Sequence, residues 1–322
     1  MLLASFPSPP FRSISIGPLD VYVYGLLIAI GVALGFNLAR KRYEALGGDG
    51  DLVDRVLVWA VLVGFVGARL AYASTRLDRF EGRPLAILAI WEGGLALFGG
   101  LTVGTLVGIA LVRRWGGDVV RFADAVAPAI PLAQAIGRWG NYFNQELFGT
   151  PTDLPWAVEI DPANRPEAYA DAATFHPTFL YESLYNLVVV AVLLRIDRRG
   201  RLKPGNLMLA YGILYGIGRF LLELIRTDTT FRLLGLSRNA LVAIAVVVGS
   251  ALVLRHRQRT APETTLLDRR AAEVEDEAED GTEDETTGAI GTTGATGATG
   301  ADVDAAPAAD TADTDRGAGA GQ

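Results

Sequence analysis

The sequence predicts an all-α, polytopic membrane protein with seven transmembrane helices. Half of its 322 residues are hydrophobic and the mean hydropathy is +0.29, which is too apolar for a soluble protein of this length. Seven apolar runs are separated by polar connections, and clusters of arginine and lysine close four of the runs. Alternating apolar runs and basic clusters are typical of chains that cross a membrane several times.

The apolar runs give the expected helices in chain order: Leu19–Ala39, Leu52–Ala73, Leu85–Val112, Val120–Ile136, Thr178–Ile196, Asn206–Ile225 and Ala240–Leu254. The segment Asn141–Pro177 separates the fourth helix from the fifth, and it is too long and too polar to be a span. The third run contains the glycine-rich stretch WEGGLALFGGLTVG, so it could also be a broken or re-entrant helix.

The distribution of basic residues predicts the orientation. Clusters follow the first, third, fifth and seventh helices, at residues 40–42, 113–114, 198–203 and 255–259. Because positive charge accumulates on the cytoplasmic side, we expect the N-terminus outside and the C-terminus in the cytoplasm, with Asn141–Pro177 extracytoplasmic. Four arginines near the outer end of the second helix oppose this rule, which suggests that they serve a function: Arg69, Arg76, Arg79 and Arg83.

Charge and composition divide the chain into a membrane domain, residues 1–259, and a tail, residues 260–322. The tail has 16 acids and 3 bases, a net −13, which leaves 20 acids and 26 bases, a net +6, in the membrane domain. The tail is acidic and then rich in Gly, Ala and Thr, so we expect it to be disordered and cytoplasmic. The chain has no cysteine, so any thiol in its chemistry must come from a substrate.

The densest group of polar side chains lies in GRWGNYFNQELFG, residues 137–149. Arg138 has a planar guanidinium that can bind a phosphate through two hydrogen bonds. Asn141 and Asn144 add amides, Glu146 adds a carboxylate, and Gly149 lets the backbone bend or approach closely. A helix end with a snorkelling arginine would explain Arg138 alone but not the whole group. We therefore predict a functional site here.

A second charged group lies inside the sixth apolar run. Arg219, Glu223 and Arg226 are spaced i, i+4 and i+7, which places them on one helix face. An ion at mid-bilayer costs about 2.5–3.5 kcal/mol on insertion scales, so each is a candidate functional residue. The alternative is a structural Arg219–Glu223 pair that holds the helices together.

These motifs resemble those of the prolipoprotein diacylglyceryl transferases, a family of bacterial inner-membrane enzymes. GRWGNYFNQELFG is similar to the family signature, and GxxRxxxExxR resembles the second key motif, in which the first arginine, here Arg219, is essential. Further similarity, covering roughly residues 18–230 in all, includes Tyr24 in VYVYGLL, Arg69 in GARLAY, Gly99 and Gly100 in LALFGGL, and His176 in HPTFLYE.

The resemblance implies that the chain transfers the diacylglyceryl group of phosphatidylglycerol to the lipobox cysteine of a prolipoprotein signal peptide. Glycerol phosphate leaves, in the first step of bacterial lipoprotein maturation. The implied location is the bacterial plasma (inner) membrane, with the active site toward the outer face. Cleavage of a carbon–oxygen bond at a phosphoester needs cations on the leaving phosphate, and Arg138 and Arg219 can supply them. We expect no cofactor, no metal and no nucleic-acid partner.

The expected catalytic residues are Arg138, Arg219 and His176. The expected substrate-binding residues are Tyr24, Arg69, Gly99, Gly100, Asn141, Asn144, Glu146, Gly149, Glu223 and Arg226. Family members usually have a histidine or tyrosine where this chain has Phe98, and phenylalanine cannot transfer a proton. Either His176 is the base or the arginines lower the pKa of the substrate thiol enough that no base is needed, and we favour the second.

Two other functions also place arginines on lipid headgroups. A lipid transporter or flippase should show inverted repeats or a second matched set of interrupted helices, and the sequence contains neither. A phosphatidylglycerol-consuming transferase with a soluble acceptor is the other alternative. A lipobox peptide together with labelled phosphatidylglycerol would separate the three.

Overall fold

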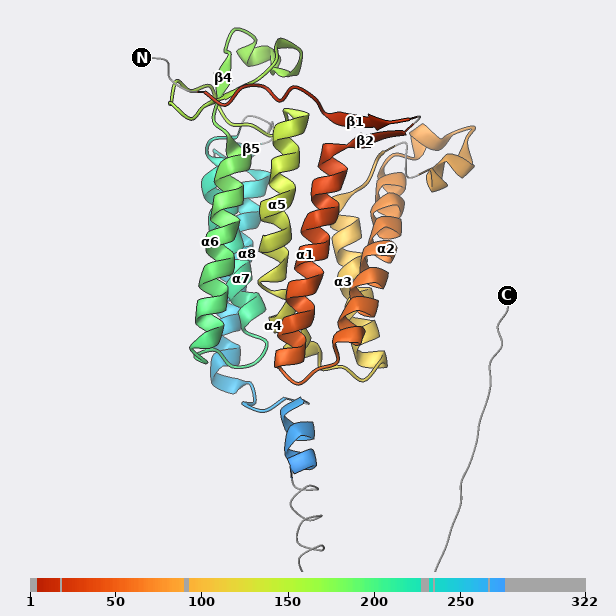
Figure 1. Cartoon of the computed structure of the whole chain (residues 1–322), viewed down its shortest axis with the longest axis vertical. Coiled ribbons are helices and arrows are strands. Elements are labelled where there is room, and N and C mark those ends of the chain that lie inside the picture. The colour runs from red at the N-terminus through yellow and green to blue at the C-terminus, as the bar shows by residue number, and fades with distance from the viewer. Residues whose placement is uncertain are drawn as a thin grey trace, which may run out of the picture. The chain divides into compact units, whose positions relative to one another are not determined.

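The computed structural model describes residues 5–17, 19–89, 93–226, 232–233, 235–265 and 267–275. It divides into two units, Met1–Glu273 and Val274–Gln322, and nearly all of the second unit lies outside the described residues. In the first unit, long helices lie side by side (Figure 1). They are α1 (Val23–Ala45), α2 (Gly50–Thr75), α3 (Leu97–Arg114), α4 (Val119–Val126), α5 (Ala129–Asn144), α6 (Thr178–Arg198), α7 (Leu207–Glu223) and α8 (Arg238–Thr260).

The length and apolar composition of these helices suit a bilayer. Within the described ranges, six helical segments are long and apolar enough to cross a membrane: α1, α2, α3, the α4–α5 pair, α6 and α8. α7 has 17 residues, one fewer than α3, the shortest of the six. The prediction of a mostly helical, polytopic membrane protein is confirmed at this level.

The structure also contains short strands, and the all-α prediction does not include them. Among the described residues they form three two-stranded antiparallel sheets: β1 (Ser13–Ile16) with β2 (Leu19–Tyr22), β3 (Val158–Glu159) with β4 (Thr174–Phe175), and β5 (Arg232–Leu233) with β6 (Leu236–Ser237). The first sheet corrects the start of the first predicted helix. Residues 19–22 pair with β1 through their backbone, so the helix begins only at Val23.

The third predicted helix is also shorter than expected. Residues 84–88 form a 3₁₀ helix that begins at Pro84, and α3 begins at Leu97 rather than Leu85. Gly93 and Gly94 have φ angles of 78° and 73°, a left-handed conformation that ends regular helix and that glycine adopts without steric cost. The broken form of this run is the one that the structure contains, although residues 90–92 lie outside the described residues.

The fourth predicted helix is two helices that together extend beyond its expected end. α4 ends before Ala127 and Pro128, and α5 then continues to Asn144 instead of Ile136. Proline lacks the N–H that a continuous helix requires, so Pro128 separates the two. As a result, all of the GRWGN motif, residues 137–141, lies within the last turns of α5.

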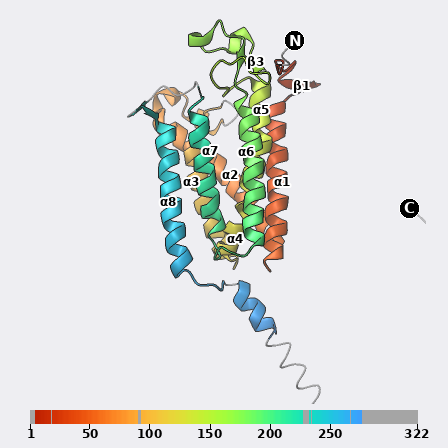
Figure 2. The ribbon, with the colours of Figure 1, turned by 90° about the vertical axis from the view of Figure 1, so that its left-hand side faces the viewer.

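Glycines let neighbouring helices approach closely. A Cβ atom on Gly67 of α2 would lie 2.6 Å from Val103 of α3, and one on Gly31 of α1 would lie 2.8 Å from the Ala133 carbonyl of α5. On α7, a Cβ on Gly216 would lie 2.6 Å from Val247 of α8. Figure 2 shows α8 beside α7 at the edge of the bundle. Small residues replace the bulk that would otherwise separate these backbones.

The polar segment after α5 folds into a small lobe rather than crossing the bundle. β3 and β4 pair within it, and Phe6 near the N-terminus forms a parallel bridge to Val158. A compact aromatic and aliphatic core includes Phe148, Phe175 and Phe179. The lobe lies at the end of the bundle where α5 ends and α6 begins (Figure 1).

The predicted tail, residues 260–322, was expected to be disordered throughout, but its first part has regular structure. Residues 267–275 are helical, and Leu267 is buried in a core cluster with Tyr43, Leu52 and Val112. The Thr265 N–H donates to Asp268 Oδ2 at 2.6 Å, a local helix-start contact that a reading of overall composition does not detect. The remainder of the predicted tail, residues 276–322, lies outside the described residues.

Candidate active site

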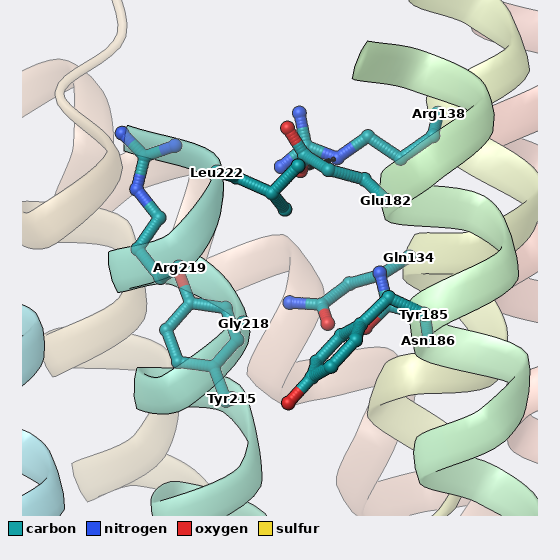
Figure 3. Close-up of a pocket in the computed structure, with 9 residues that line it drawn as sticks. All are labelled: Gln134, Arg138, Glu182, Tyr185, Asn186, Tyr215, Gly218, Arg219 and Leu222. Carbon is teal, nitrogen blue, oxygen red and sulfur yellow. Dashed lines mark ion pairs between the residues drawn. The ribbon is translucent and has the colours of Figure 1, made fainter. Parts of the chain in front are cut away.

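A polar pocket lies between α5, α6 and α7, within the apolar bundle (Figure 3). α5 contributes Gln134 and Arg138, and the other two helices contribute the rest of the lining: Glu182, Tyr185, Asn186, Tyr215, Gly218, Arg219 and Leu222. Arg138 and Arg219 therefore line the same pocket although 81 positions separate them in the chain. The sequence motifs that contain them are brought together by helix packing.

Glu182 of α6 binds two arginines. Its Oε2 lies 2.7 Å from Arg138 Nε, and its Oε1 accepts a hydrogen bond of 3.4 Å from Arg226 Nη1. The Glu182 side chain is 7% exposed, so this charge is almost wholly removed from solvent. A buried carboxylate between two guanidiniums orients both of them and offsets the cost of burying all three charges.

Arg219 has its own carboxylate partner. Its Nη2 lies 2.8 Å from Glu223 Oε2, one turn later on α7. Glu223 also accepts hydrogen bonds from Ser237 Oγ at 2.7 Å and Asn239 Nδ2 at 3.3 Å. The Glu223 side chain is only 2% exposed and the Arg219 side chain 18%, so the arginine reaches toward the pocket from a buried anchor.

The charge of this group favours an anionic ligand. Three arginines (138, 219 and 226) and two glutamates (182 and 223) leave one excess positive charge. The cavity has a volume of about 20 Å³, which admits about one water molecule. A phosphate group could therefore enter only if lining side chains move, and the guanidiniums would then exchange part of their carboxylate contacts for phosphate oxygens.

A hydrogen-bonded chain links the pocket to the end of α5. Arg138 Nη1 donates to Asn141 Oδ1 at 3.3 Å, and Asn141 Nδ2 donates to Glu146 Oε1 at 2.9 Å. Asn144 Nδ2 also lies 3.3 Å from Glu146 Oε1, and Glu146 is exposed. The ring of Tyr24 packs on Gly140, where a Cβ would lie 2.0 Å from it. These residues therefore form a polar rim around Arg138.

Comparison with known proteins supports one family. A family model described as prolipoprotein diacylglyceryl transferase matches residues 12–255. The chain belongs to this family. It is 42% identical over 295 residues to a phosphatidylglycerol–prolipoprotein diacylglyceryl transferase of Frankia alni, covering 90% of this chain and 77% of the relative. Relatives with the same name occur in Streptomyces coelicolor (transferase 2), with 42% identity over 79% of this chain and 81% of the relative, and in Synechococcus elongatus, with 40% identity over 82% and 93%.

As a diacylglyceryl transferase family member, the chain contains both signature arginines in one pocket, but other predicted residues lie elsewhere. His176 is not among the lining residues, and its Nδ1 lies 3.2 Å from the Tyr181 hydroxyl, which accepts a hydrogen bond from Trp156. Partial burial lowers the pKa of His176 below its ordinary value. Gly149 lies beside it, and a Cβ there would be 2.8 Å from His176 Cβ, so this glycine permits close chain packing.

Arg69 also lies outside the pocket lining. Its guanidinium donates to backbone carbonyls of Ala86 at 2.6 Å and Ile87 at 2.9 Å, and to those of Gly93 and Gly94. The residue is 4% exposed. These contacts attach the end of α2 to the irregular segment before α3, so they explain the arginine at this position.

Gly99 and Gly100 belong to the contact between α2 and α3. A Cβ on Gly99 would lie 2.2 Å from Ala71 Cβ, and one on Gly100 would lie 2.9 Å from the Gly64 carbonyl. Phe98 before them is 69% exposed and lines an apolar groove on the outside of the same pair. In this transferase the position that usually holds a histidine or tyrosine is therefore not a lining residue of the arginine pocket.

Seven of the nine residues that line the pocket were not predicted as site residues: Gln134, Glu182, Tyr185, Asn186, Tyr215, Gly218 and Leu222. Glu182 belongs to the HPTFLYE motif, but no function was expected of it. A carboxylate inside the apolar run 178–196 was an available signal, because an isolated ion there is costly. Tyr185 and Asn186 follow it at i+3 and i+4, which places all three on one face of α6.

Proposed function

We propose that this chain transfers the diacylglyceryl group of phosphatidylglycerol to the lipobox cysteine of a prolipoprotein, with release of glycerol phosphate. Its relatives have names that state this phosphatidylglycerol–prolipoprotein activity. The observation that supports it most is the pairing of Arg138 and Arg219 in one pocket. Two arginines that line one small pocket within apolar helices suit the phosphate of a membrane lipid.

The reaction exchanges one bond for another at a single carbon. The thiolate sulfur of the peptide attacks the glyceryl carbon next to the phosphate, and a carbon–sulfur bond forms. The carbon–oxygen bond breaks, and its electron pair leaves on the oxygen of glycerol phosphate. Arg138 and Arg219 donate hydrogen bonds to the phosphate as this charge develops, which lowers the barrier.

The two buried glutamates act as positioning residues. Glu182 holds Arg138, and Glu223 holds Arg219, at 2.7 and 2.8 Å. Tyr24, Asn141, Asn144 and Glu146 form the rim that would contact the glycerol headgroup. Four of the remaining predicted binding residues shape the backbone around the site instead: Arg69, Gly99, Gly100 and Gly149. The fifth, Arg226, pairs with Glu182.

The thiol is ionised by the positive site without a dedicated base. An unperturbed thiol with a pKa near 8.5 is already a few per cent ionised at neutral pH, and adjacent arginines lower that pKa further. Phe98 has no proton to exchange, and His176 is bonded within the lobe near Tyr181. The thiol proton then passes to solvent, and His176 orders the loop that it belongs to.

The membrane topology has seven spans, because α4 and α5 together make one span. α7 is the sixth span and α8 is the seventh. The C-terminal ends of α1, α3, α6 and α8, where the basic clusters lie, share one end of the bundle (Figure 1). That end is cytoplasmic by the positive-inside rule. The lobe after α5 is then outside, and the site opens toward the outer face of the bacterial plasma membrane.

A direct assay tests the function. The purified chain is incubated with phosphatidylglycerol labelled in both acyl and glycerol parts and with a lipobox peptide, and a peptide with serine in place of the lipobox cysteine is the control. The expected result is a diacylglyceryl thioether and glycerol phosphate in equal amounts, with the cysteine peptide only. Lipid movement without thioether would instead indicate a transporter, and transfer to small soluble acceptors would indicate the other transferase.

A further inference from the structure

A second cavity lies at the end of the bundle where α4 begins and α8 ends. Its volume is about 330 Å³, within the range of roughly 300–1,000 Å³ for small-ligand sites. The bundle contributes Asp118, Val120, Pro204 and Arg257, and the segment after α8 contributes Pro262, Thr264, Thr265 and Arg269. The cavity is separate from the pocket of Arg138 and Arg219.

The segment that completes this cavity lies beyond residues 12–255, which match the family. It is attached to the bundle by specific contacts. Arg121 Nη2 contacts both carboxylate oxygens of Asp268, at 2.8 and 2.9 Å, and the Leu267 N–H donates to Asp118 Oδ2 at 3.3 Å. The cavity is therefore lined in part by residues outside the region that the family model matches.

The carboxylates around the cavity already have partners. Asp118 Oδ1 accepts the N–H groups of Val120 and Arg121 at the start of α4, and its Oδ2 accepts that of Leu267. Asp268 is paired with Arg121. Burial alone would raise the pKa of Asp268, but hydrogen bonds from Thr265 and Arg121 lower this pKa below its ordinary value. The Asp268 carboxyl group therefore remains ionised.

The two lining arginines have no such compensation. Arg257 donates only to neutral oxygens in the described structure, Asn206 Oδ1 and the Pro204 carbonyl, both at 3.1 Å. Arg269 is exposed, and within the described ranges its side chain has no carboxylate partner. Lys203, which does not line the cavity, contacts the Ala261 carbonyl at 2.8 Å and pairs with Glu263 at 4.0 Å. Two guanidiniums without counterions, with threonines beside them, suit a phosphate group.

We propose that this cavity binds a phosphate group through Arg257 and Arg269, and that binding holds residues 261–273 on the bundle. The phosphate belongs either to a soluble phosphate ion or to the headgroup of an anionic lipid. Because one lining arginine is on the bundle and the other is on the segment, the ligand binds only the docked arrangement. It therefore stabilises docking by mass action.

Hydrogen exchange of residues 261–275 in the full-length chain tests this proposal. The chain is placed in phosphatidylcholine nanodiscs and titrated with inorganic phosphate against chloride at equal ionic strength. A second arm uses discs that also contain phosphatidic acid. Arg257→Gln and Arg269→Gln remove the proposed contacts. Arg259→Gln, an exposed arginine on the same helix end, is the matched control for loss of charge.

We expect slower exchange in at least one arm, and the arm identifies whether the phosphate is soluble or lipid-borne. Arg269→Gln should raise the phosphate concentration needed for protection by about tenfold or more, because a charged hydrogen bond usually contributes that much. Arg259→Gln should leave this concentration unchanged. Arg269 has no described side-chain contact to lose, so this variant keeps the fold even if Arg257→Gln does not. No protection in either arm, or equal weakening by Arg259→Gln, would overturn the proposal.

Discussion

At the scale of single residues, two carboxylates orient the arginine side chains of the site. Glu182 contacts Arg138 and Arg226, and Glu223 contacts Arg219. A guanidinium that is held in place loses less entropy when it binds phosphate than one that moves freely. The positions of the two glutamates therefore matter as much as the charges of the arginines.

The planar fork of each arginine should be required for turnover. In Arg138→Lys or Arg219→Lys the charge remains but the two parallel hydrogen bonds to phosphate are lost. We expect the rate of thioether formation to fall about tenfold or more, which corresponds to about 1.4 kcal/mol. Near-normal turnover of Arg219→Lys would remove two-point phosphate binding from the mechanism.

Glu182→Gln should impair both stability and activity. The substitution keeps the shape of the side chain but leaves Arg138 and Arg226 without their shared counterion, and breaking a buried pair costs about 3–5 kcal/mol. Thermal unfolding in nanodiscs and the rate of thioether formation are the measurements. Glu167→Gln, an exposed carboxylate of the lobe, is the control and should change neither. A Glu182→Gln enzyme with unchanged stability and turnover would contradict the positioning role.

His176→Gln should cause only a modest loss of rate. Because burial lowers the pKa of His176 below its ordinary value near 6.5, the ring is neutral at pH 7 and above. A rise in rate between pH 7 and 9 then reports ionisation of the substrate thiol, and the variant should keep that rise. A general base contributes about 10²–10⁴-fold, so a loss above roughly a hundredfold with intact lipid binding would exclude the base-free mechanism.

At the scale of helices, close packing of backbones determines where the polar groups meet. α2 and α3 contact each other through glycines, and α7 uses Gly216 toward α8 and Gly218 toward Tyr185 of α6. The Tyr185 hydroxyl also donates to the Leu214 carbonyl at 2.6 Å. These contacts fix the distance between α6, which positions the Glu182 partner of Arg138, and α7, which contains Arg219.

Gly99→Leu should separate α2 from α3. Its Cβ would lie 2.2 Å from Ala71 Cβ and 2.9 Å from the Gly67 carbonyl, so backbone must shift, and overpacking of this kind costs about 1–3 kcal/mol. A lower melting temperature and weaker turnover are expected. The control is Gly249→Leu on α8, where nothing lies within 4 Å of the added Cβ. Equal melting temperatures for the two variants would show that the α2–α3 contact tolerates bulk.

At the scale of the whole molecule, we expect the C-terminal extension, residues 261–322, to affect stability through its first part only. Residues 261–273 pack against the bundle through Leu267 and Asp268 at the end with the basic clusters. The proposed topology puts this end opposite the outer-facing site. The extension should therefore affect the stability of the bundle more than the chemistry.

Two truncations separate these effects. Truncation after Glu275 should change neither melting temperature nor turnover. Truncation after Arg259 removes Leu267, whose burial is worth about 1.5–3 kcal/mol, so the melting temperature should fall while turnover per folded molecule stays the same. Turnover is measured at equal amounts of folded protein. A large loss of turnover in the shorter chain would mean that the extension acts on the enzyme.

The sequence by itself determined the membrane class, most helix positions and the two arginine motifs. Each of these depends on a property of one continuous segment: apolar length, basic ends, or the spacing of charges along one helix. That is why Arg219 and Glu223, four residues apart, were predictable as a pair and are one in the structure.

The tertiary structure alone decided which distant groups meet. Glu182 joins Arg138 and Arg226, Arg69 binds carbonyls 17 to 25 residues later, and Leu267 inserts among residues of α1, α2 and α3. None of these contacts leaves a local pattern, because the partners are separated by loops whose course depends on the packing of every helix. Charge type and spacing indicate that a residue needs a partner, but only the three-dimensional arrangement determines which partner lies within hydrogen-bond distance.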